Sequence, residues 1–281
     1  MTRRSFTAQS LSAAFAPAAL SAQTPPAVTR LVRFSYRGQI SYAVQEGEDL
    51  RVIQGDLFGA YRVSSTRRKL SEVKLLYPVQ PPKILAVGQN YQSHLGGRKP
   101  PAQPEIFYKP ITCLQNPGDP IRIPPGAGNV HYEGELVVVI GKTLSKANRQ
   151  QAAEGIFGVT CGNDVSEREW QNGPNKDLQW WRAKGADTFG PMGPALVRGL
   201  DYSKLQLETR LNGKTVQKQS TADLLFDCPT IVSFVSQYVT LHPGDVIFTG
   251  TPGTTGKLSP GDVVEVEIEG IGVLRNPVVA G

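Results

Sequence analysis

The stretch HYEGELVVVIG occupies residues 131–141 and places two glutamates directly before an apolar run. The run predicts a buried strand, because it is short, rich in β-branched residues and ends at a glycine. Side chains alternate along a strand, so Glu133 and Glu135 should point to the same side, with His131 above them. Crowded, poorly solvated carboxylates persist in proteins through protonation, a positive side-chain partner or a bound cation. The stretch therefore predicts a charged centre at the mouth of a buried strand.

A third acid, Asp164, follows another apolar segment within the sequence CGNDV, residues 161–165. Three oxygen donors without a thiolate ligand suit a hard divalent cation, Mg²⁺ or Mn²⁺ before Zn²⁺. The acidic residues therefore indicate a metal-dependent enzyme.

Length and composition indicate one large domain, or one large domain with a small module. The chain has 281 residues, of which 40% are hydrophobic, so it can bury a substantial core. The 29 glycines and 22 prolines follow no period, and few long helical patterns occur, which favours a turn-rich, strand-rich fold. The net charge of +6 is scattered apart from residues 67–69, which argues against a nucleic-acid surface. No apolar run has the length needed to span a membrane.

The first 23 residues resemble an export signal. Arg3 and Arg4 precede a weakly apolar stretch from Leu11 to Leu20, and this order is similar to a twin-arginine signal peptide. The sequence thus predicts a periplasmic or extracytoplasmic protein; the alternative is a cytoplasmic protein with a disordered tail. We expect a small N-terminal β domain over 28–80 and a metal-dependent catalytic domain over 82–281.

Local patterns predict several further elements. Alternating segments at 30–36 and 40–44, joined by Arg37-Gly38, indicate a hairpin with a third strand at 50–53. Helix formers favour helices within 144–154 and 224–238. Pro81-Pro82 marks a linker. Buried or alternating strands are expected at 83–88, 245–249, 262–268 and 272–274.

Other common chemistries are not supported. Residues 253–257 superficially suggest a phosphate loop, but Thr251 replaces its first glycine and Leu258 replaces the Ser/Thr. No Gly-x-Ser-x-Gly elbow exists for a serine hydrolase. The three cysteines lack metal-site spacing and should be small buried hydrophobic residues; they are Cys113, Cys161 and Cys228. His242 precedes a Pro-Gly turn, and His94 alone would be an unremarkable loop residue.

Several motifs together carry a resemblance. From about Arg30 to its C-terminus, the chain resembles the fumarylacetoacetate hydrolase family, in particular bacterial members with a small N-terminal β domain. The matching stretches, in order, are GQNYQSH (88–94), PEIFYKP (104–110), HYEGEL (131–136), NDVSER (163–168), Lys184 before DTF (187–189), and TGTP (249–252).

The resemblance implies a mixed, β-rich roll or barrel-like fold, usually dimeric, that binds Mg²⁺, Mn²⁺ or Ca²⁺. It implies metal ligation by Glu133, Glu135 and Asp164. The residues that it implies at the substrate are, as catalytic candidates, His94, Lys184 and Gln171 and, as binding candidates, Thr251, Gly250, Arg168 and Tyr91. Family members act on small diketo and oxo acids.

The resemblance leaves the reaction open. Our leading hypothesis is a hydrolase or lyase that cleaves or decarboxylates an oxo acid through a metal-chelated enolate, with His94 as general base. The alternatives are an isomerase, by a keto–enol or double-bond shift, and a non-catalytic protein that binds the metal and an oxo acid. Family members that cleave or decarboxylate often orient the histidine with a glutamate three residues later. Gly97 stands at that position here, so Glu105 or another acid would have to replace it.

Overall fold

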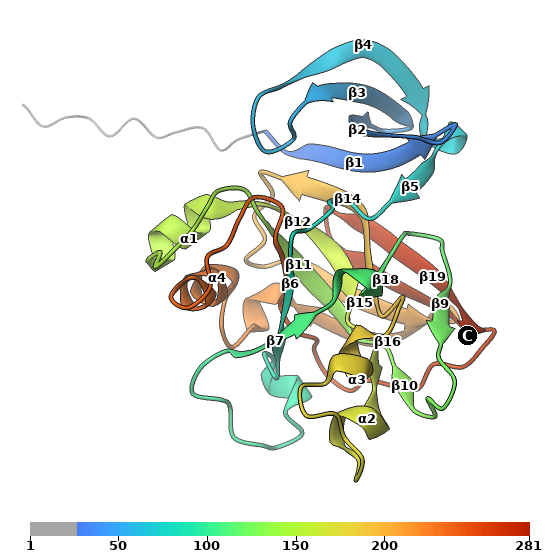
Figure 1. The fold of residues 1–281 in the computed structure, drawn as a ribbon, viewed down its shortest axis with the longest axis vertical. Helices are drawn as coiled ribbons and strands as arrows, with labels where there is room; N and C mark the ends of the chain where they lie inside the picture. Colours follow the sequence, from blue (N-terminus) through green and yellow to red (C-terminus); the bar gives the residue numbers. More distant parts are fainter. Residues whose placement is uncertain (1–26) are drawn as a thin grey trace, which may run out of the picture.

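A computed structural model describes residues 27–281, and it is rich in β-structure with a few short helices (Figure 1). The signal peptide expected over residues 1–23 lies outside the described residues. No helix in the described part is long and apolar enough to cross a membrane.

The largest sheet has twelve strands and runs through the whole molecule. Its order is β4 (Tyr61–Lys69), β3 (Asp49–Gly55), β2 (Gln39–Glu46), β1 (Thr29–Tyr36), β14 (Gly190–Arg198), β12 (Ile156–Asn163), β11 (Gly134–Ile140), β17 (Val246–Phe248), β6 (Ile84–Gly88) and β7 (Glu105–Lys109). Two short strands pair beside this path, β5 (Lys74–Leu76) on β1 and β8 (Leu114–Gln115) on β14.

A second sheet, a two-stranded ribbon and four α-helices complete the described part of the chain. The five-stranded sheet has the order β16 (Lys214–Ser220), β15 (Gln206–Leu211), β18 (Val263–Ile268), β19 (Gly272–Ala280) and β9 (Ile121–Ile123). A two-stranded ribbon joins β10 (Val130–His131) to β13 (Ser166–Glu167). The helices are α1 (Arg149–Gly155), α2 (Arg168–Asn172), α3 (Trp181–Gly185) and α4 (Cys228–Ser236).

Strand β11 lies at the centre of the core and is buried on both faces. Leu136, Val138 and Ile140 pack into the cluster that includes α4 and the five-stranded sheet. The alternate residues Val137 and Val139 pack on the opposite side. Burial on both faces explains why this strand is an unbroken apolar run rather than an alternating one. It also fixes the position of the glutamates at its start.

The N-terminal module continues the main sheet. Strands β1 to β5 form the upper lobe in Figure 1, and β1 pairs antiparallel with β14, with Leu31 opposite Leu196. Phe34 and Ala195 pack into one small core between them. The module is therefore joined to the rest of the main sheet by backbone hydrogen bonds as well as by side-chain packing.

Most elements expected from the sequence are present, with shifted ends. The hairpin and the strands expected at 83–88, 245–249 and 262–268 are confirmed, and the last strand extends to Ala280. The helix expected within 144–154 begins only at Arg149, because the Asn148 side chain accepts a hydrogen bond from Gln151 N–H and caps it. The helix expected within 224–238 is limited to α4 by its cap at Asp227. The cysteines are free and buried, as expected.

Candidate active site

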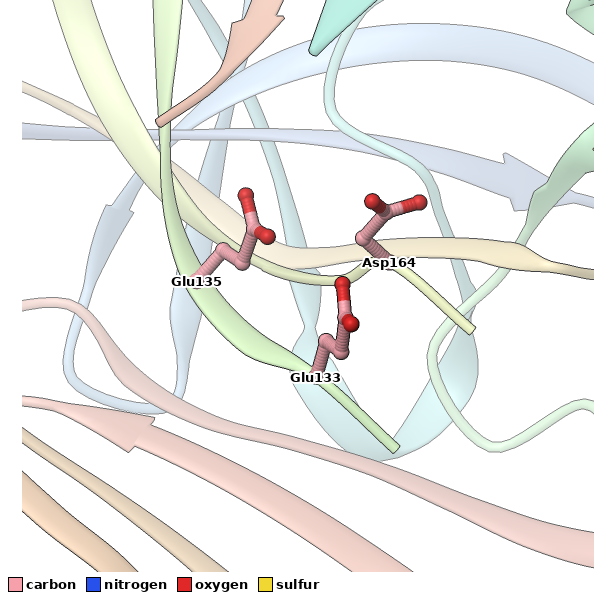
Figure 2. A group of neighbouring side chains, drawn as sticks. All are labelled: Glu133, Glu135 and Asp164. Carbon is pink, nitrogen blue, oxygen red and sulfur yellow. The ribbon is translucent and has the colours of Figure 1, made fainter. Parts of the chain in front are cut away.

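The structure brings the three predicted acids together. Strands β11 and β12 pair antiparallel with Gly134 opposite Asn163, so the residues that flank this pair meet. Asp164 N–H also donates to the carbonyl of Glu133 at 2.9 Å. Each of Glu133, Glu135 and Asp164 offers a carboxylate oxygen within 4.8 Å of the others, and all three are buried (Figure 2). Asp164 thus shares one centre with glutamates that lie 31 and 29 positions earlier in the sequence.

Two buried lysines neutralise part of this centre. Lys184 Nζ donates to Glu133 Oε2 at 2.6 Å and to Asp164 Oδ2 at 2.7 Å. Lys109 Nζ donates to Asp164 Oδ1 at 2.5 Å and to the carbonyls of Lys184 and Phe189. We call Glu133, Glu135, Asp164, Lys109 and Lys184 the cavity base. Burial would lower the pKa of Lys109, but the charge of Asp164 outweighs it, so the pKa is raised and the lysine is cationic.

The carboxyls of the cavity base differ in their partners. Burial would raise the pKa of Glu133, but Lys184 and Arg168 outweigh it and hold that pKa well below its usual range. Arg168 Nη2 contacts Glu133 Oε1 at 2.6 Å. Glu135 makes no ion pair among residues 27–281 and accepts a hydrogen bond from Gly250 N–H at 2.7 Å. Burial, together with the charges of Asp164 and Glu133, raises the pKa of Glu135 well above its usual value.

These residues fit a hard divalent cation. Glu135 is a buried carboxyl that lacks a positive partner, and it faces two other carboxyls within coordinating range. A cation held by oxygens of Glu133, Glu135 and Asp164 would supply the charge that lets Glu135 ionise. The donor set is all oxygen, which suits Mg²⁺, Mn²⁺ or Ca²⁺ better than a thiolate-preferring metal.

A cavity of about 200 Å³ opens above the cavity base, and its lining is mostly polar. Among the predicted residues, His94, Gln171, Arg168 and Thr251 line it, with the base itself below. Gln171 Oε1 accepts from Arg168 Nη1 at 2.7 Å, so these two side chains hold each other in place.

Two residues predicted to bind the substrate, Tyr91 and Gly250, do not line the cavity. The Tyr91 side chain is fully buried outside the cavity lining, and Gly250 acts through its N–H on Glu135. The Thr251 hydroxyl donates to the carbonyl of Gly134 at 2.9 Å and accepts from Gln217 at 2.9 Å. Thr251 therefore braces the start of β11 as well as lining the cavity.

His94 is oriented by a backbone carbonyl. It ends a short 3₁₀ turn, Gln92–His94, and its Nδ1 lies 2.7 Å from the carbonyl oxygen of Gly253. A carbonyl oxygen can only accept a hydrogen bond, so Nδ1 carries the hydrogen and Nε2 of the neutral ring is the acceptor. Glu105, considered as a replacement for the family glutamate, is exposed on β7 and does not line the cavity. We call His94 and Arg98 the cavity rim.

Sequence reasoning gave no role to Lys109 or Arg98, and it placed His131 above the glutamates without assigning it a role. Lys109 carried a usable signal, since it lies two residues after the buried Phe107 in one strand and so shares its face. His131 Nδ1 contacts Thr255 Oγ1 at 2.9 Å, and Thr255 in turn accepts from Arg168 at 2.8 Å. Burial, with Arg168 nearby, lowers the pKa of His131 to about 4, so the ring is neutral near pH 7.

Comparison with known proteins accounts for nearly the whole described chain. Residues 83–279 match the family model "Fumarylacetoacetate (FAA) hydrolase C-terminal", and residues 29–78 match "Rv2993c-like, N-terminal". Protein Rv2993c of Mycobacterium tuberculosis is 41% identical over 262 residues, which cover 89% of this chain and 98% of that protein.

Two further relatives have names that state a reaction. The mitochondrial oxaloacetate tautomerase fahd2 of Xenopus laevis is 40% identical over 222 residues, covering 74% of this chain and 69% of that protein. The crystal structure of 2-hydroxyhepta-2,4-diene-1,7-dioate isomerase from Mycobacterium marinum is 41% identical, with a TM-score of 0.83 over 90% of this chain and 98% of that one.

Proposed function

The chain belongs to the fumarylacetoacetate hydrolase family, and we propose that it is a metal-dependent tautomerase or isomerase of small 2-oxo acids. The observation that carries the proposal is the contact between His94 and the Gly253 carbonyl, above a base of three carboxyls. Relatives named as a tautomerase and as an isomerase support the same reaction class.

The cavity base would bind the oxo-acid end of the substrate. A divalent cation held there, when bound, supplies Lewis acidity toward a carbonyl oxygen. The chain itself contributes the ammonium of Lys184 and the guanidinium of Arg168, both beside Glu133. Their positive charge favours negative charge on the substrate oxygen as a proton leaves carbon. These residues therefore lower the cost of an enolate without taking part in bond cleavage.

His94 would move the proton. Its Nε2 accepts a proton from the carbon next to the carbonyl, and return of that proton to the oxygen gives the enol. The keto and enol forms contain the same atoms, so the reaction consumes no water and breaks no carbon–carbon bond. One correctly held imidazole is enough for this exchange.

Hydrolytic cleavage, our first hypothesis from the sequence, receives less support. Cleavage needs a histidine that activates water, and in the family a glutamate often orients it. Gly97, at the glutamate's position, has φ +84°, a conformation in which a side chain is strained. A neutral carbonyl partner stabilises a protonated imidazole less than a carboxylate does. Proton transfer within a substrate demands less of His94 than hydrolysis does.

The proposed function is tested by measuring the loss of the enol and the products formed in the same reaction. Full-length protein loaded with Mg²⁺ or Mn²⁺ is mixed with the enol form of oxaloacetate, and loss of enol absorbance is recorded beside NMR analysis of products. We expect faster enol–keto conversion with all carbon retained, and loss of the effect with a chelator. The same metal without protein is the control for spontaneous reaction. Pyruvate formed at the rate of enol loss, or cleavage of an acylpyruvate, would instead establish a lyase or hydrolase.

A further inference from the structure

Arg98 is a cationic side chain at the cavity rim, and some of its hydrogen-bond donors are not used within the described part of the protein. It follows the turn that carries His94 and lines the same cavity. Its Nε donates to the carbonyl of Leu95 at 2.8 Å, which leaves the terminal guanidinium nitrogens free of this bond. Arg98 forms no ion pair with any acidic side chain of residues 27–281.

The other cations that line the cavity are already engaged. Lys184 binds two carboxylates, and Arg168 binds Glu133, Gln171 and Thr255. Their hydrogen bonds hold them at the cavity base, where their charge acts on the oxo-acid end of a ligand and not on a carboxylate at the rim. Within the described part of the chain, Arg98 is therefore the lining cation that can receive a new anionic partner.

The backbone around Arg98 holds it at the rim. Gly96 and Gly97 have φ values of +57° and +84°, which glycine adopts without strain, and Arg98 N–H donates to the carbonyl of Leu95 at 3.1 Å. Together with the Nε bond, this places two Arg98 donors on one carbonyl. The buried Leu95 anchors the turn beneath them.

We infer that Arg98 binds the distal carboxylate of the substrate and thereby selects short 2-oxo diacids over monoacids; this inference rests on the proposed function. The carboxylate and oxo group of a 2-oxo acid occupy the cavity base, so the rest of the ligand extends toward the rim. The cavity, at about 200 Å³, lies below the usual range for drug-sized ligands, which limits the chain to a few carbons. A carboxylate at that end matches the fork of donors on a guanidinium.

The first test measures binding with two ligands matched in length. Titration calorimetry on full-length, Mg²⁺-loaded protein compares 2-oxoglutarate with 2-oxopentanoate, in which a methyl group replaces the distal carboxylate. We expect the parent to prefer the diacid by about tenfold, the scale of a charge-assisted hydrogen bond. Arg98→Met should abolish the preference and leave 2-oxopentanoate affinity unchanged. Lys99→Met, which removes the neighbouring exposed charge, should behave as the parent.

The second test separates specificity from general damage. With oxaloacetate as substrate, Arg98→Met should raise KM about tenfold with kcat nearly constant, while the 4-methyl ester should show no change. Equal losses on both substrates, an effect of Lys99→Met as large as that of Arg98→Met, or no diacid preference in the parent would overturn the inference. If the diacid preference depends on Arg98 but no tautomerisation occurs, the inference stands and the proposed function fails.

Discussion

The cavity base and the cavity rim are built in different ways. The acids of the base lie at the ends of paired central strands, and its lysines are buried within ion pairs and carbonyl contacts. The rim lies on a short 3₁₀ turn and two glycines. It is held by hydrogen bonds to backbone carbonyls, one from His94 and two from Arg98. The base is therefore fixed by the fold, whereas the rim can change with little cost to stability. Under the proposed function, the base would determine where a ligand binds, and the rim would determine which reaction and substrate follow.

The largest effect should come from removing an acid of the base. Asp164→Asn leaves the buried Lys109 without its carboxylate partner, so we expect the unfolding free energy to fall by about 3–5 kcal/mol. Metal binding and activity should be lost as well. Glu135→Gln removes a carboxyl without an ion-pair partner, so metal-free stability should change by no more than about 1 kcal/mol while metal binding is lost. Urea denaturation with a chelator, and calorimetric metal titration, measure the two quantities.

Glu105→Gln is the matched control for these two variants, because Glu105 is an exposed acid on β7, at the edge of the same sheet. It should leave both stability and metal affinity at parental values. If Asp164→Asn and Glu135→Gln destabilised the metal-free protein equally, the distinction between paired and unpaired carboxyls in the base would be wrong.

At the rim, loss of His94 should affect catalysis alone. His94→Ala is expected to lower kcat by about 10²–10⁴-fold, the usual contribution of a general acid–base group. Metal affinity and melting temperature should stay at parental values, because His94 is bonded to a loop carbonyl and not to the base. Enol-conversion rates measured beside thermal melts test this separation. A drop in melting temperature as large as that of Asp164→Asn would show that the rim supports the fold.

The smallest effect concerns His131, which contacts Thr255 and Asn129. Its folded pKa of about 4 lies below its ordinary value of 6.5, so the unfolded chain binds the extra proton between these values. Its stabilising contribution is therefore complete above pH 6.5 and falls as pH decreases toward 4. In metal-free protein, His131→Asn should remove this dependence of the unfolding free energy on pH. The expected difference is only about 1 kcal/mol, since the ring is partly exposed and screened.

Glu135 contributes a pH dependence of stability with the opposite sign in this pH range. Its raised pKa makes the folded state hold a proton that the unfolded state releases. The parent and His131→Asn share this contribution, so it cancels when their denaturation curves are subtracted at each pH. A difference curve without slope between pH 4 and 6.5 would contradict the lowered pKa of His131.

The same contrast explains what the sequence could predict. Strand alternation places Glu133 and Glu135 on one side, and the position of Asp164 after an apolar segment matches the family pattern, so the acids of the base were predictable. The partner of His94 was not, because the Gly253 carbonyl is 159 residues away and a backbone carbonyl has no residue-type signal. Strand β4 was also missed, since its sequence YRVSSTRRK lacks clear polar–apolar alternation.

Pairing between β1 and β14 makes the amino-terminal lobe integral to the protein. Deleting that lobe would remove the backbone partners of Leu196–Arg198 on β14 and expose a sheet edge there. An exposed edge can pair with other chains and promote aggregation. Shortened chains that begin at Pro81-Pro82 should therefore aggregate more readily than the full-length protein.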